Sequence, residues 1–147
     1  MSTKRSVIQR GCPMVNEDGT ASETIKPGYL VKGISTIAKQ TATTTGVPPV
    51  AVALERDELG AGIDNAHQGS GTGTAFYASG DKVKVAVFSK GQRFVGFVAS
   101  GQNVTEDDQF QSAGDGTFAE GTTKPIVRAC ETLGAVTTET ACVFEVL

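Results

Sequence analysis

The chain has 147 residues and a net charge of −3, with 39% hydrophobic and 20% charged residues. This length suffices for one domain with its own core; the acidic balance argues against a nucleic-acid binder, and no apolar run approaches the roughly 20 residues of a membrane span. The first ten residues hold no long apolar stretch, so we expect no secretory signal. The 18 glycines, the frequent threonines and the short valine-rich runs predict an all-β chain rich in turns.

We predict an N-terminal arm over residues 1–24 and a single β domain over residues 25–147. The apolar anchors of the arm are two short pairs: Val7 and Ile8, Met14 and Val15. They are too short for an independent core. Two alternatives are open. The arm is either a flexible tail or edge strand of its own domain, or a segment that orders against a neighbouring subunit by adding a strand or wrapping a surface.

The next elements alternate between turns and strands. Ile25–Val31 reads as a turn into a strand, because Pro27 presets φ and Gly28 permits the bend. The Thr-rich segment 33–46 predicts a strand pair with a loose connection. Residues 50–55, Val-Ala-Val-Ala-Leu-Glu, follow as a buried strand. Residues 56–79 form a glycine-rich loop that cannot hold a regular element.

Residues 81–98 predict a central β-hairpin. Val83, Val85 and Val87 alternate with smaller or charged residues, which places the valines on one face of a strand. Lys90 and Gly91 supply a tight turn. The second strand, which includes Phe94 and Phe97, is apolar on both faces. A strand with one face in water does not need apolar residues on both faces, so we expect this second strand to lie inside a sandwich, a barrel or an oligomer interface.

Three further strands complete the chain. One precedes the Gly114–Gly116 turn, which returns the chain to Thr117 and Phe118; another covers residues 125–133. The last is residues 141–147, where Cys142, Phe144 and Val146 share one face. We therefore predict an all-β fold: a small β-barrel or sandwich, β-tulip-like and built from hairpins, with an extended N-terminal arm.

Candidate catalytic groups are sparse. The odd cysteine count, Cys12, Cys130 and Cys142, argues against a disulfide framework and a metal site, and favours small buried apolar thiols. Acidic residues such as Asp115 sit beside glycines in turns, where Asp forms local hydrogen bonds. His67 lies in the Gly/Ser-rich loop, which favours a solvated side chain. We expect no enzyme activity, no cofactor and no metal site.

Lys90 suggests one sharper hypothesis, because lipoyl and biotinyl carrier domains are small β structures with a modified lysine at a hairpin turn. The flanking residues, Phe88–Ser89 and Gly91–Gln92, match neither carrier sequence. A solvated turn lysine is the favoured interpretation. A carrier or small-molecule-binding β domain remains the alternative function.

Several segments in order resemble the decoration, or cement, proteins of tailed-bacteriophage capsids. They are residues 25–31, 53–64, 80–91, 99–104, 112–117 and 144–147. The resemblance runs from about residue 25 to the end of the chain. It implies a β-rich subunit, often a trimer, that binds the outside of an expanded head and reinforces it.

This resemblance sets the remaining expectations. The partner is the major capsid protein, the oligomer is a trimer, and the location is the outer capsid surface of the virion, after synthesis in the host cytoplasm. No nucleic acid or membrane is involved. The residues expected at capsid or oligomer contacts are the arm anchors and two strand phenylalanines: Val7, Ile8, Met14, Val15, Phe94 and Phe97.

Overall fold

The computed structural model describes residues 7–43, 50–55 and 76–147, and every regular element in these ranges is a β-strand. The all-β prediction is confirmed. The strands are β1 (Ile8–Arg10), β2 (Met14–Ala21), β3 (Val31–Lys32), β4 (Thr36–Lys39), β5 (Val50–Ala53), β6 (Lys82–Phe88), β7 (Arg93–Val98), β8 (Asn103–Val104), β9 (Gln109–Ser112), β10 (Phe118–Glu120), β11 (Val127–Ala129), β12 (Gly134–Ala135) and β13 (Thr140–Val146).

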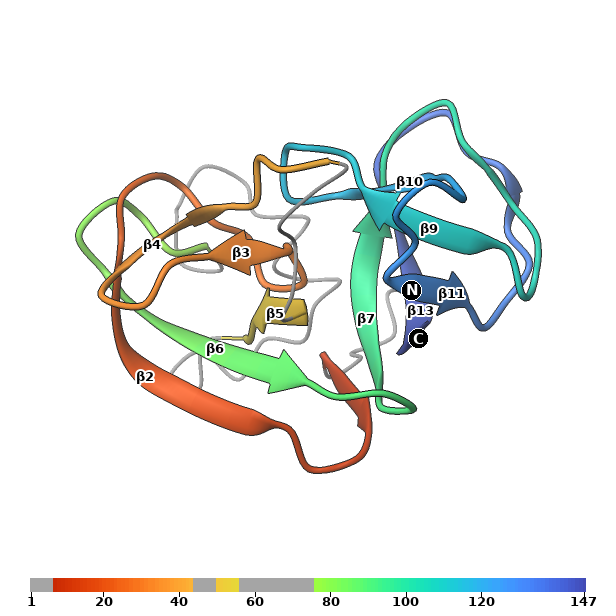
Figure 1. Cartoon of the computed structure of the whole chain (residues 1–147). Helices are drawn as coiled ribbons and strands as arrows, with labels where there is room; N and C mark the ends of the chain where they lie inside the picture. The colour runs from red at the N-terminus through yellow and green to blue at the C-terminus, as the bar shows by residue number, and fades with distance from the viewer. Residues whose placement is uncertain (1–6, 44–49, 56–75) are drawn as a thin grey trace, which may run out of the picture.

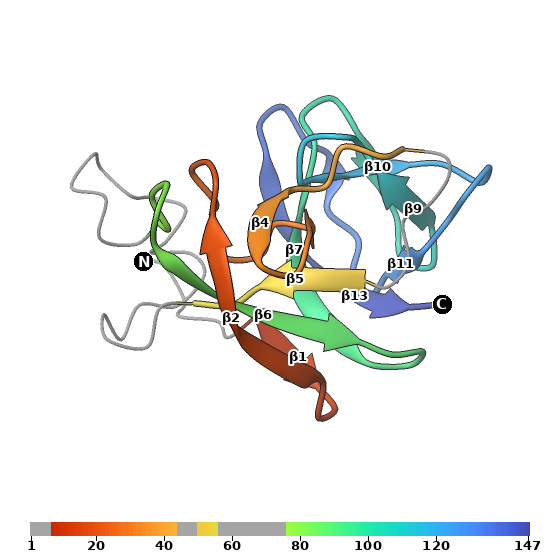
Figure 2. The same ribbon diagram turned by 60° about the vertical axis from the view of Figure 1, so that its left-hand side comes forward.

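The strands form two halves that lie side by side (Figures 1 and 2). The first half is a sheet in the order β3-β4-β2-β6-β5, and a bridge between Leu30 and Val52 brings its two ends together. In the second half, β7 pairs with β13, and the order continues through β11, β9 and β10 back to β7. This closes a small barrel, in which strand pairing covers the edges that an open sheet would leave free.

The core of the second half is a cluster of phenylalanine rings. The Phe144 ring lies with its centroid 4.7 Å from that of Phe118, 5.5 Å from Phe110 and 5.9 Å from Phe94. Gly96 makes room for them, since a Cβ atom there would lie 2.9 Å from a ring carbon of Phe118. The two halves share one hydrophobic core, in which Phe88 of β6 packs 4.9 Å from Phe94 of β7.

The predicted central hairpin is wrong, although both of its strands and its turn exist. Gly91 has φ +87°, and Gln92 N–H donates to the Ser89 carbonyl, which closes the turn. However, β6 pairs with β2 and β5, whereas β7 pairs with β1, β10 and β13. The turn therefore carries the chain from one half to the other. This position explains why β7 is apolar on both faces.

Residues 7–24 do not stand apart from the β domain. Val7 is fully buried, and its N–H donates to Glu55 Oε2 over 2.8 Å. Strand β2 lies between β4 and β6, and β1 extends the second half beside β7. Among the alternatives for this segment, the structure corresponds to strands of the chain's own domain.

The last strand follows the prediction, because Cys142, Phe144 and Val146 are buried on one face of β13. Cys130 lies next to β13, where its N–H donates to the Val143 carbonyl. Cys130 and Cys142 are nevertheless free thiols, and Cys12 is a free, exposed thiol. Burial raises the pKa of the Cys130 thiol, which favours its protonated form.

Candidate functional site

Three large hydrophobic side chains of the first half are exposed to solvent. The exposed fractions are 80% for Ile34, 76% for Met14 and 44% for Val15. Single exposed hydrophobic residues are common. What distinguishes Ile34 is that it borders a pocket of about 490 Å³.

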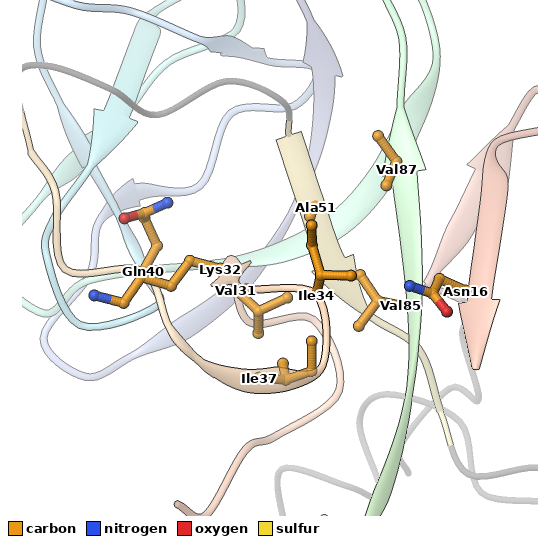
Figure 3. Close-up of a pocket in the computed structure, with 10 residues that line it drawn as sticks. Asn16, Val31, Lys32, Ile34, Ile37, Gln40, Ala51, Val85 and Val87 are labelled. Atoms are coloured by element: carbon orange, nitrogen blue, oxygen red, sulfur yellow. The ribbon is translucent and has the colours of Figure 1, made fainter. Parts of the chain in front are cut away.

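The pocket is the open mouth of the first half (Figure 3). Its apolar walls come from four strands and the β3–β4 turn: Val31, Ile34, Ile37, Ala51, Val85 and Val87. Figure 3 shows these side chains around a common space, with Lys32 and Gln40 on one side and Asn16 on the other. This volume lies within the range of about 300–1,000 Å³ found for ligand pockets.

Strand register explains why these walls share one face. Val87 lies opposite both Met14 and Ala51, and Val85 lies opposite Asn16. Directly opposite residues of antiparallel strands point to the same side. Met14 therefore belongs to the same sheet face as the pocket wall, beyond its edge. Val15 lies opposite Ala86 and therefore points to the other face of the sheet. We call Met14 and Ile34 the apolar rim.

Glycines set the shape of the β3–β4 end of the mouth. Gly33 has φ +103°, and a Cβ atom there would lie 1.9 Å from the Thr36 carbonyl oxygen, so no other residue fits this tight turn. The turn holds Ile34 out at its tip. Gly19 lets β2 approach Ile37, whose side chain would lie 2.4 Å from an added Cβ atom.

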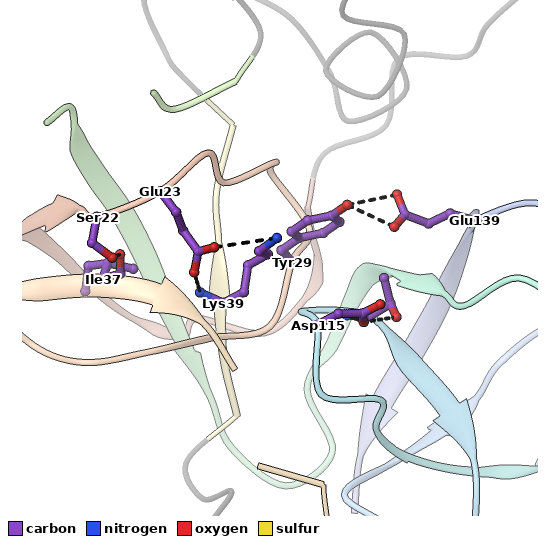
Figure 4. A network of polar contacts seen from close by, with 8 residues as sticks. Ser22, Glu23, Tyr29, Ile37, Lys39, Asp115 and Glu139 are labelled. Atoms are coloured by element: carbon purple, nitrogen blue, oxygen red, sulfur yellow. Dashed lines mark hydrogen bonds and ion pairs between the residues drawn. The ribbon is translucent and has the colours of Figure 1, made fainter. Parts of the chain in front are cut away.

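A polar network beside the mouth joins the two halves (Figure 4). The hydroxyl of Tyr29, just before β3, donates to Glu139 Oε1 over 2.9 Å, just before β13. Glu23 accepts from the Lys39 N–H over 3.0 Å, and its carboxylate lies 3.6 Å from Lys39 Nζ. Burial raises the pKa of Tyr29, and the hydrogen bond to Glu139 raises it further. Tyr29 is thus a neutral donor, which suits a structural link between the halves.

The six predicted contact residues separate into two groups. Met14, in the apolar rim, and Val15, on the other face of β2, are exposed, and Ile8 is half-buried. Val7, Phe94 and Phe97 are at most 1% exposed, inside the chain's own core. In the single chain these three side chains have almost no surface exposed to a partner. The prediction missed Ile34, whose signal was a large aliphatic residue directly after a glycine.

Lys90 and His67 are the remaining candidate groups from the sequence. Lys90 is exposed in its turn, and His67 lies outside the described residues. Over residues 7–43, 50–55 and 76–147, no three His, Cys, Asp or Glu side chains gather in a way that would hold a metal ion. The same ranges contain no helix with the length and apolar character needed to cross a membrane.

The carboxylate of Glu145 in β13 is paired with an arginine on the neighbouring strand β11. Arg128 Nε and Nη2 both donate to its Oε2 atom, the former over 2.8 Å. Hydrogen bonding from Arg128 lowers the pKa of Glu145, and the positive charges of Arg128, Arg93 and Arg10 act in the same direction. Burial of the carboxyl group opposes this shift without cancelling it.

The lowered pKa predicts acid-sensitive stability. The ionised Glu145 stabilises the fold above the pKa of the unfolded chain, about 4.3, and this stabilisation is lost as pH falls through the lower folded pKa. We expect Glu145→Gln to be less stable than the parent near pH 7, with a gap that narrows below about pH 4. Urea denaturation across this range measures the gap, with Glu106→Gln, at an exposed carboxylate, as control. A gap independent of pH would contradict the assignment.

Comparisons with known proteins bear on the fold. No family model matches the sequence, and no curated protein matches it. Among solved structures, the chain is similar to the head fiber gp8.5 N base of bacteriophage phi29, with a TM-score of 0.53 and 13% sequence identity. The match covers 91% of this chain and 95% of the other. At this identity, the likeness shows a shared β architecture over nearly the full length of both chains.

Proposed function

We propose that this protein is a structural protein of a phage head, and more specifically a decoration or cement subunit on the outer capsid surface. The observation that carries the proposal is the near full-length fold likeness to a phage head fiber base. The ordered sequence segments that resemble decoration proteins point to the same class independently. Such a protein works by shape and adhesion, and it needs no catalytic group.

In this proposal the apolar rim and the adjoining pocket make the contact with the major capsid protein. The rim offers exposed Met14 and Ile34, and the pocket offers a concave apolar wall that accommodates an aliphatic side chain of the shell. Apolar anchors in well-packed pockets dominate the affinity of many interfaces. A polar surround, here Lys32, Gln40 and Asn16, then orients the partner.

We further propose a trimer on the shell. One rim buries little area, so a single contact is weak. Three contacts made at once raise the effective concentration of each rim at its site, and the avidity then far exceeds the affinity of one contact. A subunit that binds only the assembled shell stabilises that shell by mass action.

Binding to heads tests this function. Expanded, undecorated heads of the source phage should bind the purified protein stoichiometrically, and Ile34→Asp should weaken binding by at least about tenfold. Ala135→Asp, an exposed substitution in the β8–β12 ribbon, should not. Failure of the parent protein to bind such heads would contradict the proposal, and equal losses in both variants would place the contact elsewhere.

The exposed Cys12 provides a second readout of the same experiment. It lies two residues before Met14, whereas Cys142 is buried and Cys130 is half-buried. Alkylation of Cys12, followed by peptide mass mapping, should slow when the protein sits on heads. An unchanged rate on saturated heads would exclude the rim as the contact.

The pocket also favours a second candidate, a small-molecule-binding β domain. Its volume and largely apolar wall suit a compact aliphatic or aromatic ligand. Native mass spectrometry of the purified protein distinguishes the two: a bound small molecule of constant mass supports the second candidate. The carrier version requires a covalent mass increment at Lys90, which intact mass of native material tests directly.

A further inference from the structure

Four charged side chains form one row across neighbouring strands of the second half. The register places Arg10 of β1 opposite Arg93 of β7, Arg93 opposite Glu145 of β13, and Glu145 opposite Arg128 of β11. Directly opposite residues share a sheet face. The row, which we call the arginine row, holds three positive charges and one negative charge in a chain whose net charge is −3.

The single carboxylate of the row is already engaged. Glu145 accepts two hydrogen bonds from Arg128, which also lies 3.6 Å from Asp107. Arg93 Nε lies 3.7 Å from Glu145 Oε1, too far for a hydrogen bond. That Nε atom is buried and has no hydrogen-bond acceptor within the described part of the chain.

The positive charges of Arg10 and Arg93 are therefore only partly balanced by carboxylates in the described part of the chain. Across residues 7–43, 50–55 and 76–147, no salt bridge reaches Arg10, and like charges directly opposite each other on paired strands are destabilising. Both side chains reach solvent, since Arg10 is exposed and the Arg93 side chain is 37% exposed. A second carboxylate bound at the exposed part of these side chains would separate the two positive charges.

We propose that the arginine row binds a carboxylate side chain from an acidic protein segment. Arg93 and Arg10 are the binding residues, because planar guanidinium groups match a carboxylate with paired donors. Glu145 is a positioning residue: it fixes Arg128 and leaves the opposite side of Arg93 to the ligand. This site is separate from the apolar rim, and it does not depend on the proposed function.

The charge pattern favours a carboxylate ligand over the phosphates of a nucleic acid. Glu145 stands within the row and Asp107 lies beside its Arg128 end, so a polyanion that tracks along the row would meet two negative charges. A single carboxylate side chain needs only the Arg10–Arg93 end. The overall negative charge of the chain further disfavours a long polyanion.

Titration of the full-length protein with a hexaglutamate peptide tests the site. The probe is the Arg Nε–Hε region of a ¹H–¹⁵N NMR spectrum, which detects weak binding. We expect a saturable shift of the Arg93 Hε signal in the parent. In Arg93→Gln, read from the Arg10 Hε signal that this variant keeps, we expect a loss of affinity of about tenfold, as for removal of a charge-assisted hydrogen bond. Lys82→Gln, which removes an exposed positive charge from the other half, should change the affinity less than about twofold.

Two further measurements separate the possible outcomes. Arg93→Lys keeps the charge and removes the planar fork, so it should bind more weakly than the parent and more tightly than Arg93→Gln; it also replaces Arg93→Gln if that variant fails to fold. The absence of a saturable Arg93 shift, or equal losses in Arg93→Gln and Lys82→Gln, would overturn the proposal. Tighter binding of tripolyphosphate than of hexaglutamate would also overturn it, in favour of a phosphate site. Heads are not used, so failure here leaves the head-binding proposal standing.

Discussion

Replacing Phe144 with alanine is expected to lower the free energy of unfolding by about 3–5 kcal/mol. Phe144 is fully buried, and its ring contacts those of Phe94, Phe110 and Phe118. The neighbouring rings come from three other strands of a closed barrel, so they cannot collapse into the space left by the missing ring. The loss combines the transfer free energy of the ring with the cost of the cavity.

Such a loss is a large part of the stability of a domain of this size, commonly about 5–15 kcal/mol. Urea denaturation followed by circular dichroism measures it. Met14→Ala, at a side chain that is 76% exposed, is the matched control and should stay within about 0.5 kcal/mol of the parent. A Phe144→Ala variant as stable as the control would mean that the ring cluster does not hold the second half together.

The central turn could be predicted from the local sequence alone. A tight turn of this kind needs a residue with positive φ, and Gly91 adopts one. Which strands pair across that turn is decided by contacts distant in sequence. Strand β13 pairs with β7 from Arg93 to Val98, and β1 and β10 also pair with β7, so no side of β7 is left for β6. The apolar character of both faces of β7 was the available signal that it lies inside the fold.

Phe94 and Phe97 show why burial does not identify an interface. A side chain in a domain core and one in an oligomer interface are both removed from water, so composition cannot distinguish them. The structure assigns both residues to the core. Ile34 is the converse case: in sequence it looks like a core residue of a Thr-rich strand, and only the turn at Gly33 places it outside.

The arginine row could not be predicted from sequence patterns. Its four members come from strands spread over nearly the whole chain, from Arg10 to Glu145. A one-residue change in any register would move a member to the other face. The irregularity between Ile8 and Arg10, which places Arg10 opposite Arg93, cannot be read from the amino-acid order.

Deleting residues 1–21 is expected to prevent cooperative folding, and this reverses what a detachable arm would predict. Strand β2 lies between β4 and β6, so its loss exposes the long edge of β6 and opens the sheet between β4 and β6. The buried side chains of Val7 and Ala21 leave the core. Two backbone links are lost as well: Ala21 N–H donates to the Asp81 carbonyl, and Val95 N–H donates to that of Val7.

The truncated chain should show no cooperative urea transition and poor dispersion of its amide NMR signals. In the parent, the amide of Ala21 should exchange slowly with deuterium even without a partner, because it is hydrogen-bonded inside the sheet. The double variant Met14→Asp and Val15→Asp is the control: it alters the exposed start of β2 but keeps the backbone of the strand, so it should fold. A truncated chain that folds as well as this control, with only head binding lost, would restore the view of residues 1–21 as an independent arm.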